Sequence, residues 1–354
     1  MRVGYLHIGN EGGGVRRYGL MIAQAARQRS DIEVIEADGG GRDGSKPRLT
    51  EAARALAGAD VVHIQWKPND WGRGRVAFGA LRAFAKACGR PMVVTLHDVW
   101  ERHGIRERWL ETDAHAIRWL GRNAARLTVH AREERRRLGG SVPDGRVVVV
   151  PHFVEERTMA DAGASRAALG LTDKRAITVL GWMVRRKGYR LTVDALPLLP
   201  DDVVAVFAGA PITGREERAT ELKARAVELG VSDRLVITGY ISDERLDQAL
   251  AATAVACCPF SDLSASGSLS TWISTGRPIV TSDLPQFREY DEMVPGALRI
   301  FSPRTAEALA AAVRAVLDNE TPVTDPKVVE LAAQLSPART VERFVEVYRA
   351  AAGR

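Results

Sequence analysis

The sequence predicts an α/β protein with two Rossmann-like domains that face each other across a cleft. Three observations support this fold class. The chain has 354 residues, more than a single hydrophobic core usually organises. Short apolar runs alternate with longer amphipathic segments, as strands and helices do in βαβ units. This alternation occurs twice along the chain, with a polar stretch between the two series.

The first series predicts a parallel sheet in the N-terminal half. Its short runs are apolar throughout rather than alternating, which is typical of strands covered by helices on both faces. The predicted strands are residues 3–8, 32–35, 61–64, 92–96, 127–130 and 147–150. The predicted helices include residues 15–29, 76–88 and 109–125.

The second series repeats this pattern in the C-terminal half. The predicted strands are residues 177–180, 203–207, 235–237, 255–258, 279–281 and 298–301. The predicted helices are residues 190–198, 215–229, 243–252, 268–274 and 304–318. The predicted organisation is a first domain over 1–154, a linker over 155–174, a second domain over 175–335 and a C-terminal segment over 336–354. Ser336 is a suitable N-cap for a helix in that last segment, which could pack back on the N-terminal domain.

Composition excludes several classes of protein. Hydrophobic residues make up 45% of the chain and charged residues 27%, the balance of a folded protein rather than a disordered one. No apolar run reaches the ~18 residues of a membrane-spanning helix, and the first residues predict a strand rather than a signal peptide. Three cysteines, two of them adjacent, make no disulfide framework, so we expect a cytoplasmic protein. The net charge of +6 permits an anionic partner, but no nucleic-acid recognition motif accompanies it, so we expect no nucleic acid.

Histidines gather at the ends of the predicted N-terminal strands. All seven histidines of the chain lie in its first 152 residues. Five of them, His7, His63, His97, His130 and His152, fall at or near strand ends. Ligands of open α/β sheets bind at that edge, so we expect a polar wall that titrates near neutral pH. A metal site is the rival interpretation, but no pair has helical i,i+4 spacing and no acidic cluster accompanies them. Any single one could also be a structural residue.

Two small-residue loops precede helices and suit a ligand. Residues 10–17 contain Glu11, Gly13 and Gly14, which let a ligand approach the backbone at a helix N-terminus. This loop is neither a dinucleotide-binding fingerprint nor a P-loop, and it could be a simple tight turn. In the second half, Ser264, Ser266, Gly267 and Ser268 precede or open a short helix. Backbone N–H groups and hydroxyls there can surround a phosphate, although a capped loop is the alternative.

A basic turn ends the first predicted strand of the second half. Arg185, Arg186 and Lys187 follow one another where a helix is about to begin. Cations at a helix N-terminus oppose the helix dipole, and a bound polyanion would resolve this conflict. A solvated basic turn is the plainer interpretation.

Taken in order, five segments resemble the family 4 glycosyltransferases of the GT-B fold. They are residues 11–18, 94–98 (Val-Thr-Leu-His-Asp), 149–153 (Val-Val-Pro-His-Phe), 179–188 and 276–283 (Gly-Arg-Pro-Ile-Val-Thr-Ser-Asp). The resemblance extends over nearly the whole chain. It implies that the N-terminal domain receives the acceptor and that the C-terminal domain binds a nucleotide-sugar donor.

The resemblance also implies roles for individual residues. Gly13 and Gly14 match the loop that approaches donor and acceptor, His97 matches a histidine near the transferred sugar, and Lys187 matches the lysine that pairs with the donor diphosphate. Glu289 falls near a glutamate often found after the Gly-x-Pro strand. We assign the acceptor side to Glu11, His63, His130 and His152.

The chain departs from the family pattern at three positions. Trp182 stands where the family carries an arginine, so we expect Arg185 or Arg186 to replace that arginine in donor binding. The family's paired glutamates are replaced by Leu263 and Thr271. The Ser-rich segment lies where the phosphate-contacting backbone would be.

The expected function is therefore glycosyl transfer from a nucleotide-diphosphate sugar to a hydroxyl acceptor, with His97 and Lys187 in catalytic roles. The family retains anomeric configuration, and no Asp-x-Asp occurs in the sequence, so we expect no metal and no cofactor beyond the co-substrate. A nucleotide-sugar epimerase of the same fold and a non-catalytic nucleotide-sugar binding protein are the alternatives. An NAD enzyme is disfavoured by the imperfect glycine turn.

The region from 73 to 137 suggests a membrane contact. It carries an excess of cations, and four tryptophans lie in it or just before it: Trp71, Trp100, Trp109 and Trp119. Basic and aromatic side chains favour an anionic bilayer surface. The acceptor could then be lipid-linked, and the enzyme peripheral at the inner face of the membrane. The alternative interpretation is a solvated basic face above core tryptophans, with a soluble acceptor.

Overall fold

The computed structural model describes residues 1–41, 46–72, 74–97, 99, 108–262, 266–319 and 323–353. The chain forms two compact units. The first consists of Met1–Phe153 together with Leu335–Arg354, and the second of Val154–Gln334. Among the helices that the structure describes, none is both long and apolar enough to cross a bilayer.

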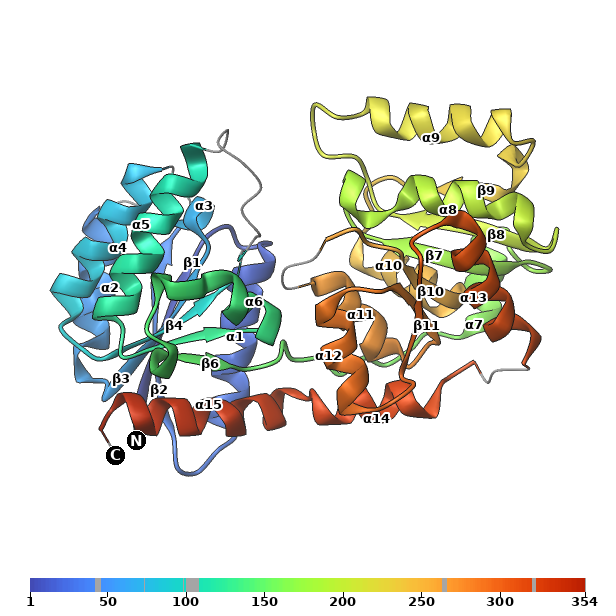
Figure 1. Ribbon diagram of the computed structural model, residues 1–354. Helices are drawn as coiled ribbons and strands as arrows, with labels where there is room; N and C mark the ends of the chain where they lie inside the picture. Colours follow the sequence, from blue (N-terminus) through green and yellow to red (C-terminus); the bar gives the residue numbers. More distant parts are fainter. Residues whose placement is uncertain are drawn as a thin grey trace. The chain divides into compact units, whose positions relative to one another are not determined.

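The first unit contains a parallel six-stranded sheet in the order β2-β1-β3-β4-β5-β6 (Figure 1). The order changes direction at β1, as in other doubly wound sheets. The strands are β1 (Arg2–Ile8), β2 (Glu33–Gly40), β3 (Val61–Trp66), β4 (Met92–Leu96), β5 (Arg126–Val129) and β6 (Val147–Val149). All strands predicted in this half are thus present, with ends that differ by up to five residues.

Helices cover both faces of this sheet and bury a separate apolar cluster on each. One cluster lies under α2, α4 and α5, and the other under α1 and α15. The helices are α1 (Gly14–Arg27), α2 (Lys46–Ala55), α3 (Pro68–Trp71), α4 (Arg75–Cys88), α5 (Arg108–Asn123), α6 (Arg132–Leu138) and α15 (Pro337–Ala351). The C-terminal helix α15 contacts α1, and its N-cap is Ser336, whose hydroxyl accepts from Arg339 N.

The second unit repeats the parallel architecture in the order β12-β11-β10-β7-β8-β9. Its strands are β7 (Arg175–Leu180), β8 (Val203–Ala208), β9 (Leu235–Ile237), β10 (Thr253–Cys258), β11 (Ile279–Ser282) and β12 (Leu298–Phe301). Its helices are α7 (Ala162–Ala168), α8 (Tyr189–Ala195), α9 (Glu217–Glu228), α10 (Asp243–Ala252), α11 (Gly267–Thr275), α12 (Pro285–Met293), α13 (Ala306–Asp318) and α14 (Pro326–Gln334). The fold class expected from the sequence, α/β with two parallel sheets, is confirmed.

The segment predicted as a linker is not a plain connection. Residues 155–174 contain α7 and belong to the second unit. Asp161 caps this helix, because its carboxylate accepts a hydrogen bond from Ala164 N at 2.7 Å. Leu171 then packs against the second sheet. The helix was missed because its apolar content is mostly alanine, which gives little periodic signal.

Candidate functional site

In the first unit, one face of the sheet carries a row of polar side chains. Strand side chains alternate between faces, and the parallel register places Gln65 beside Thr95 and Thr95 beside Thr128. His97 and His130 follow two residues after these threonines and therefore point to the same face, toward α1. Both histidines are about 95% buried: their exposed fractions are 5% and 4%.

Tyr18 of α1 lies at the centre of this group. Its ring centroid is 5.1 Å from that of His97, 5.2 Å from that of His130 and 4.8 Å from that of His152. Phe153 stacks on the same tyrosine at 4.9 Å. The structure therefore brings three of the five predicted histidines into one cluster. Sequence analysis did not identify Tyr18, although its position one turn after Gly14 on the same helix would have suggested it.

A chain of hydrogen bonds runs from His97 into the interior. His97 Nε2 donates to Gln65 Oε1 at 2.8 Å, and Gln65 Nε2 donates to His63 Nε2 at 3.2 Å. His63 Nδ1 lies 2.8 Å from the hydroxyl of Tyr348, which is 3.1 Å from that of Tyr5. If His97 carries its proton on Nε2 and His63 on Nδ1, each of these bonds has one donor and one acceptor. The amide of Gln65 thus fixes the tautomer of His97.

Burial keeps these imidazoles neutral. It lowers the pKa of His63 and His130 to about 3 and that of His7 and His152 to about 4. The pKa of His97 also falls well below its usual value, mainly through burial and secondarily through neighbouring histidines. The prediction that these histidines titrate near neutral pH is therefore wrong. At pH 7 these histidines are neutral hydrogen-bond donors and acceptors, because desolvation disfavours the charged form.

His63 and His7 lie apart from the ring cluster. His63 is fully buried, bonds to Thr95 and Tyr348, and packs on Phe344 of α15, so its assignment to the acceptor side is corrected to a structural role. It sits in the middle of β3 rather than at its end, because β3 extends to Trp66. His7 bonds to Glu36 through Nε2 at 2.8 Å, while its Nδ1 is buried without a partner among the described residues.

The glycine-rich loop of the first unit forms the start of α1. Gly13 is the N-cap and Gly14 the first helical residue, and no acidic residue occurs in the first turn. A Cβ built at Gly14 would meet no atom within 4 Å, so this glycine faces open space. Glu11 is exposed in the preceding turn. This loop is therefore accessible to a ligand, and it lies one helical turn before Tyr18.

In the second unit, Lys187 and the start of α11 come together. Lys187 Nζ donates to Leu180 O at 2.6 Å and to Ser268 Oγ at 3.2 Å. Ser268 Oγ is 3.0 Å from Ser266 Oγ, and Ser266 caps α11 by accepting from Leu269 N at 3.3 Å. The first turn of α11 has no acidic residue. A half-buried cation, two hydroxyls and a helix N-terminus thus converge, and this combination suits an anion.

Close packing holds Lys187 in place. Gly188 has φ +74°, and a Cβ there would collide with the carbonyl oxygen of Pro259 at the end of β10. A Cβ at Gly181 would collide with Lys187 Nζ. Burial, the largest effect, lowers the pKa of Lys187 to about 8, so the side chain is still mostly protonated at pH 7. Its ammonium also lies 5.7 Å from the ring centre of Phe260.

The other predicted donor residues fall in different places. Arg185 lines a cavity beside α8 and α9, not the Lys187–Ser268 group, whereas Arg186 lies close enough to lower the pKa of Lys187. A Cβ at Gly267 would meet no atom within 4 Å in the part of the chain that the structure describes. Glu289 lies on α12. Ser264 lies outside the described residues.

The structure also brings together two exposed aromatic residues whose contact was not predicted from the sequence. Trp182, which stands in place of the family's arginine, is 53% exposed, and Tyr240 is 79% exposed. Their ring centroids are 6.4 Å apart. They follow β7 and β9, at the same sheet edge as Lys187. Spacing in the sequence gives no signal that these two side chains meet.

Known protein families match both halves of the chain. Residues 174–319 match the family described as glycosyl transferases group 1, and residues 11–152 match the glycosyl transferase 4-like domain. The chain is 26% identical over 217 residues to a GDP-mannose-dependent α-(1-6)-phosphatidylinositol monomannoside mannosyltransferase of Mycolicibacterium smegmatis. That match covers 57% of this chain and only 51%, about half, of the relative. It is 25% identical over 282 residues to a 2-deoxystreptamine glucosyltransferase of Streptomyces kanamyceticus, covering 75% of this chain and 70% of the relative.

Solved structures share the fold. Anabaena HepE in complex with UDP and glucose superimposes with a TM-score of 0.75 at 16% identity, covering 98% of this chain and 99% of that chain. Sucrose-phosphate synthase from Thermosynechococcus elongatus gives a TM-score of 0.74 at 15% identity, covering 99% and 98%. The two family matches together cover most of the chain, one in each unit. The protein therefore belongs to the group 1 glycosyltransferases of the GT-B fold.

Proposed function

We propose that this chain transfers a glycosyl group from a nucleoside-diphosphate sugar to an acceptor hydroxyl. The observation that carries the proposal is the group formed by Lys187, Ser268 and Ser266 at the N-terminus of α11. The relatives add support: the mycobacterial one is named as GDP-mannose-dependent, and HepE binds UDP and glucose.

The chemistry of the leaving group fits these residues. When the glycosidic bond to the donor breaks, negative charge builds up on the departing diphosphate. A protonated Lys187, N–H groups of α11 and the Ser268 hydroxyl stabilise that charge without reorganising, because their positions are already fixed. Lys187 is half-buried, and this strengthens the interaction because electrostatic attraction grows as the local dielectric falls.

The neutral histidines suit the opposite task, which is to hold uncharged hydroxyl groups. His97, held by its Nε2 bond to Gln65, would help to orient a sugar or acceptor hydroxyl as a neutral imidazole. We assign His97 to orientation rather than to general base catalysis. We further propose a retaining, metal-independent reaction in which the departing phosphate takes the acceptor proton.

Thermal unfolding with UDP-, GDP-, ADP- and TDP-glucose tests donor binding. A donor at 100 times its dissociation constant should stabilise the protein by about 2.7 kcal/mol. Lys187→Met should weaken binding by about 1.5–3 kcal/mol, the value of a lost charged hydrogen bond, while the exposed control Lys223→Met should bind normally.

Two results would overturn the proposal. One is the absence of stabilisation by any nucleotide sugar. The other is unchanged affinity for the nucleoside diphosphate in Lys187→Met. A product assay completes the test, since conversion of the donor sugar to its epimer without an acceptor would favour the epimerase.

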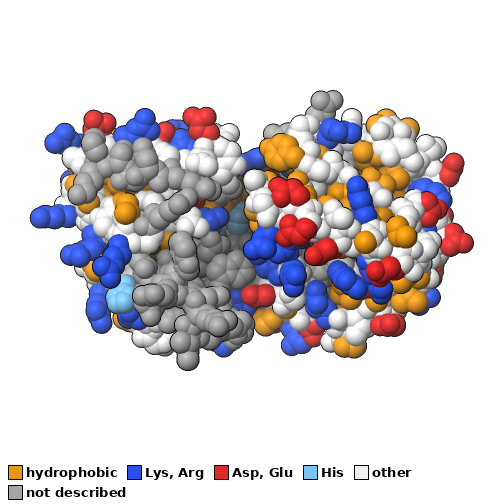
Figure 2. Space-filling view, turned by 90° about the horizontal axis from the view of Figure 1, so that it is seen from above, with side chains coloured by type: hydrophobic (Ala, Val, Ile, Leu, Met, Phe, Trp, Pro, Cys, Tyr) orange, Lys and Arg blue, Asp and Glu red, His pale blue; other side chains and the backbone are white. Residues whose placement is uncertain are grey.

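For the acceptor, we propose a lipid-linked molecule presented at an anionic membrane surface. Residues 74–97 contain no Asp or Glu, and a groove of about 580 Å³ between α4 and α5 is lined by Arg82, Lys86, Arg90 and Trp119. Val76, on α4, is 58% exposed. Lys and Arg side chains predominate along the outer edge of the first unit, on the left of Figure 2.

The tryptophan part of the membrane prediction needs correction. Trp71 is fully buried and packs on Trp66 and Phe84, so it belongs to the core. Trp119 is partly buried against Phe78. The side chains of Trp100 and Trp109 lie outside the described residues. The support therefore rests on the cations of α4 and α5 rather than on an aromatic belt.

Co-sedimentation with phosphatidylglycerol vesicles tests this contact. Each well-placed cation contributes about 1 kcal/mol near anionic lipid, so Arg82→Glu with Lys86→Glu should release most of the protein at low salt. Arg314→Glu, an exposed change on α13, is the matched control. Absence of binding at low salt would indicate a soluble acceptor; the Streptomyces relative is named as a 2-deoxystreptamine glucosyltransferase.

A further inference from the structure

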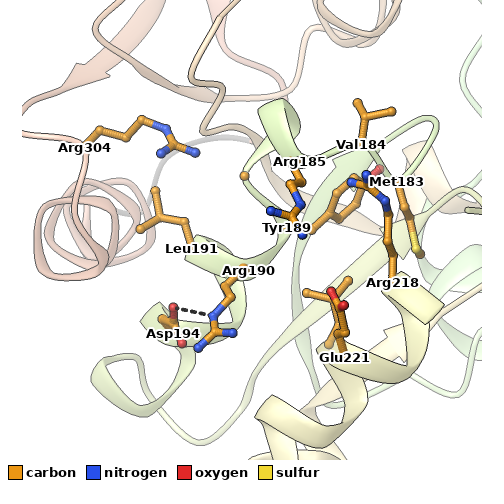
Figure 3. Close-up of a pocket in the computed structure, with 12 residues that line it drawn as sticks. Met183, Val184, Arg185, Tyr189, Arg190, Leu191, Asp194, Arg218, Glu221 and Arg304 are labelled. Atoms are coloured by element: carbon orange, nitrogen blue, oxygen red, sulfur yellow. Dashed lines mark ion pairs between the residues drawn. The ribbon is translucent and has the colours of Figure 1, made fainter. Parts of the chain in front are cut away.

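A second cavity of about 450 Å³ lies in the second unit, beside α8 and α9. Its floor is apolar and is formed by Met183, Tyr189, Leu191 and Leu222. Four arginines line it: Arg185, Arg190, Arg218 and Arg304. Figure 3 shows Arg185 and Arg218 extending into the region over Tyr189, while Arg304 approaches from the other side.

The positive charge of this cavity is not balanced by its carboxylates. Asp194 is already engaged, with Arg225 Nε at 2.7 Å and Arg190 Nε at 3.6 Å. Glu221 is exposed on α9. Among the residues that the structure describes, Arg185, Arg218 and Arg304 have no carboxylate within 4.0 Å. Three guanidinium groups therefore line the cavity without an ion pair, and its four arginines outnumber its two carboxylates.

Two backbone carbonyl groups anchor Arg304, whose side chain is exposed. Its Nε donates to the carbonyl oxygens of Pro259 and Phe260 at 3.0 and 3.1 Å, which directs the guanidinium toward the cavity. Burial lowers the pKa of this guanidinium. Its carbonyl partners carry no opposite charge, so an oxyanion in the cavity would add charge-assisted hydrogen bonds. The planar guanidinium suits phosphate oxygens in particular.

The cavity is separate from the group proposed to hold the donor diphosphate. Arg185 and Lys187 belong to one short 3₁₀ turn, η4 (Arg185–Lys187), whose successive side chains point about 120° apart at three residues per turn. Arg185 therefore faces the cavity while Lys187 faces Ser268. Neither Lys187, Ser266 nor Ser268 lines the cavity.

We propose that this cavity binds a phosphorylated small molecule distinct from the nucleotide sugar. Its phosphate lies beside Arg185 and Arg218, and its carbon skeleton lies over Met183 and Leu191 toward Arg304. The apolar floor favours a phosphate monoester over free phosphate, because the skeleton then removes apolar surface from water. The cavity volume suits a ligand of the size of a sugar or polyol phosphate.

Methyl NMR of the methionines tests this site directly. Met183 is 2% exposed on the cavity floor, so its methyl group reports on the cavity, and Met183→Leu assigns its signal. Titration with glycerol 3-phosphate should shift that signal saturably, and inorganic phosphate should do so more weakly. Glycerol, the uncharged control, should leave it unchanged.

Paired variants separate this site from donor binding. Arg218→Gln should weaken glycerol 3-phosphate binding at least about tenfold and leave nucleoside diphosphate affinity unchanged. Lys187→Met should show the opposite pattern, and the exposed control Arg314→Gln should change neither. The inference is overturned if the Met183 signal does not respond, if Arg218→Gln binds as the parent does, or if Lys187→Met abolishes the response. The last result would mean that the phosphate occupies the donor site.

Discussion

The two units share one architecture and differ in how they handle charge. Each has a parallel six-stranded sheet with helices on both faces. The first unit holds all seven histidines of the chain, five of them with pKa values lowered mainly by burial, and the second unit has none. The second unit instead places a protonated lysine among serine hydroxyls at its strand ends. The same fold therefore holds a group of neutral, hydrogen-bonding histidines in one unit and a cationic site in the other. The side chains rather than the topology determine the chemistry of each site.

The largest expected effect of this difference is on acid stability. The five buried histidines have folded-state pKa values below the usual 6.5, so the unfolded chain binds more protons as pH falls. Their contribution to the free energy of unfolding is complete above pH 6.5. Below it, each loses up to about 1.4 kcal/mol per pH unit until its folded-state pKa is reached.

Hydrogen exchange at pH 7 and pH 5 measures this difference. Strands β1, β3, β4 and β5 should lose protection at pH 5 before β7, β8 and β10 of the histidine-free unit. Equal loss of protection in both units would contradict the comparison.

A change at His97 should affect turnover more than binding. We expect His97→Ala to lower turnover by about 10²-fold, because a fixed hydrogen bond at the reacting sugar acts mostly in the transition state. Its donor affinity should change little. Initial rates and thermal shifts with the same nucleotide sugar measure the two quantities. Equal losses of rate and affinity, or no loss, would make His97 a structural residue like His63.

The two helix-initial glycines allow a matched test of the units. Gly14 begins α1, Gly267 begins α11, and a Cβ at either would meet no atom of the described residues within 4 Å. Gly267→Val should therefore fold normally but weaken nucleoside diphosphate binding, by about 1.5–3 kcal/mol if charged phosphate contacts are lost. Gly14→Val should lower turnover with little change in that affinity. Isothermal titration and rate measurements distinguish the two patterns, and a Gly267→Val variant that binds the donor normally would reduce the serine segment to a capped loop.

The smallest expected effect is the pH dependence of donor binding. A diphosphate favours protonated Lys187, whose folded-state pKa is about 8, so affinity should fall by up to about tenfold per pH unit above pH 8. Stability without ligand should change in the opposite direction. The unfolded chain holds this proton up to its usual pKa of 10.5, so the free energy of unfolding rises with pH over that range.

Titrations between pH 7 and 9 measure this dependence. Lys187→Arg, which stays charged throughout, should remove it. A pH dependence that persists in Lys187→Arg would assign the titration to another group.

The sequence by itself determined the strand series of both units and the order of the family segments, because buried parallel strands are continuous apolar runs bounded by turns. It also placed His97, Lys187, Ser266 and Ser268 at strand or helix ends, where ligands of such sheets bind. It missed α7, whose alanines leave no clear period. The helix at 337–351 was predicted, but its packing in the first unit was left open.

Only the tertiary structure decided the protonation states and the contact partners of these side chains. Neutral histidines, a lysine pKa near 8 and the separation of Arg185 from Lys187 all depend on burial and on which strands are neighbours. Tyr18 and Tyr348, far apart in the sequence, reach the histidines because α1 and α15 cover the same face of one sheet. Desolvation and long-range contacts arise from the whole fold, so no local pattern encodes them.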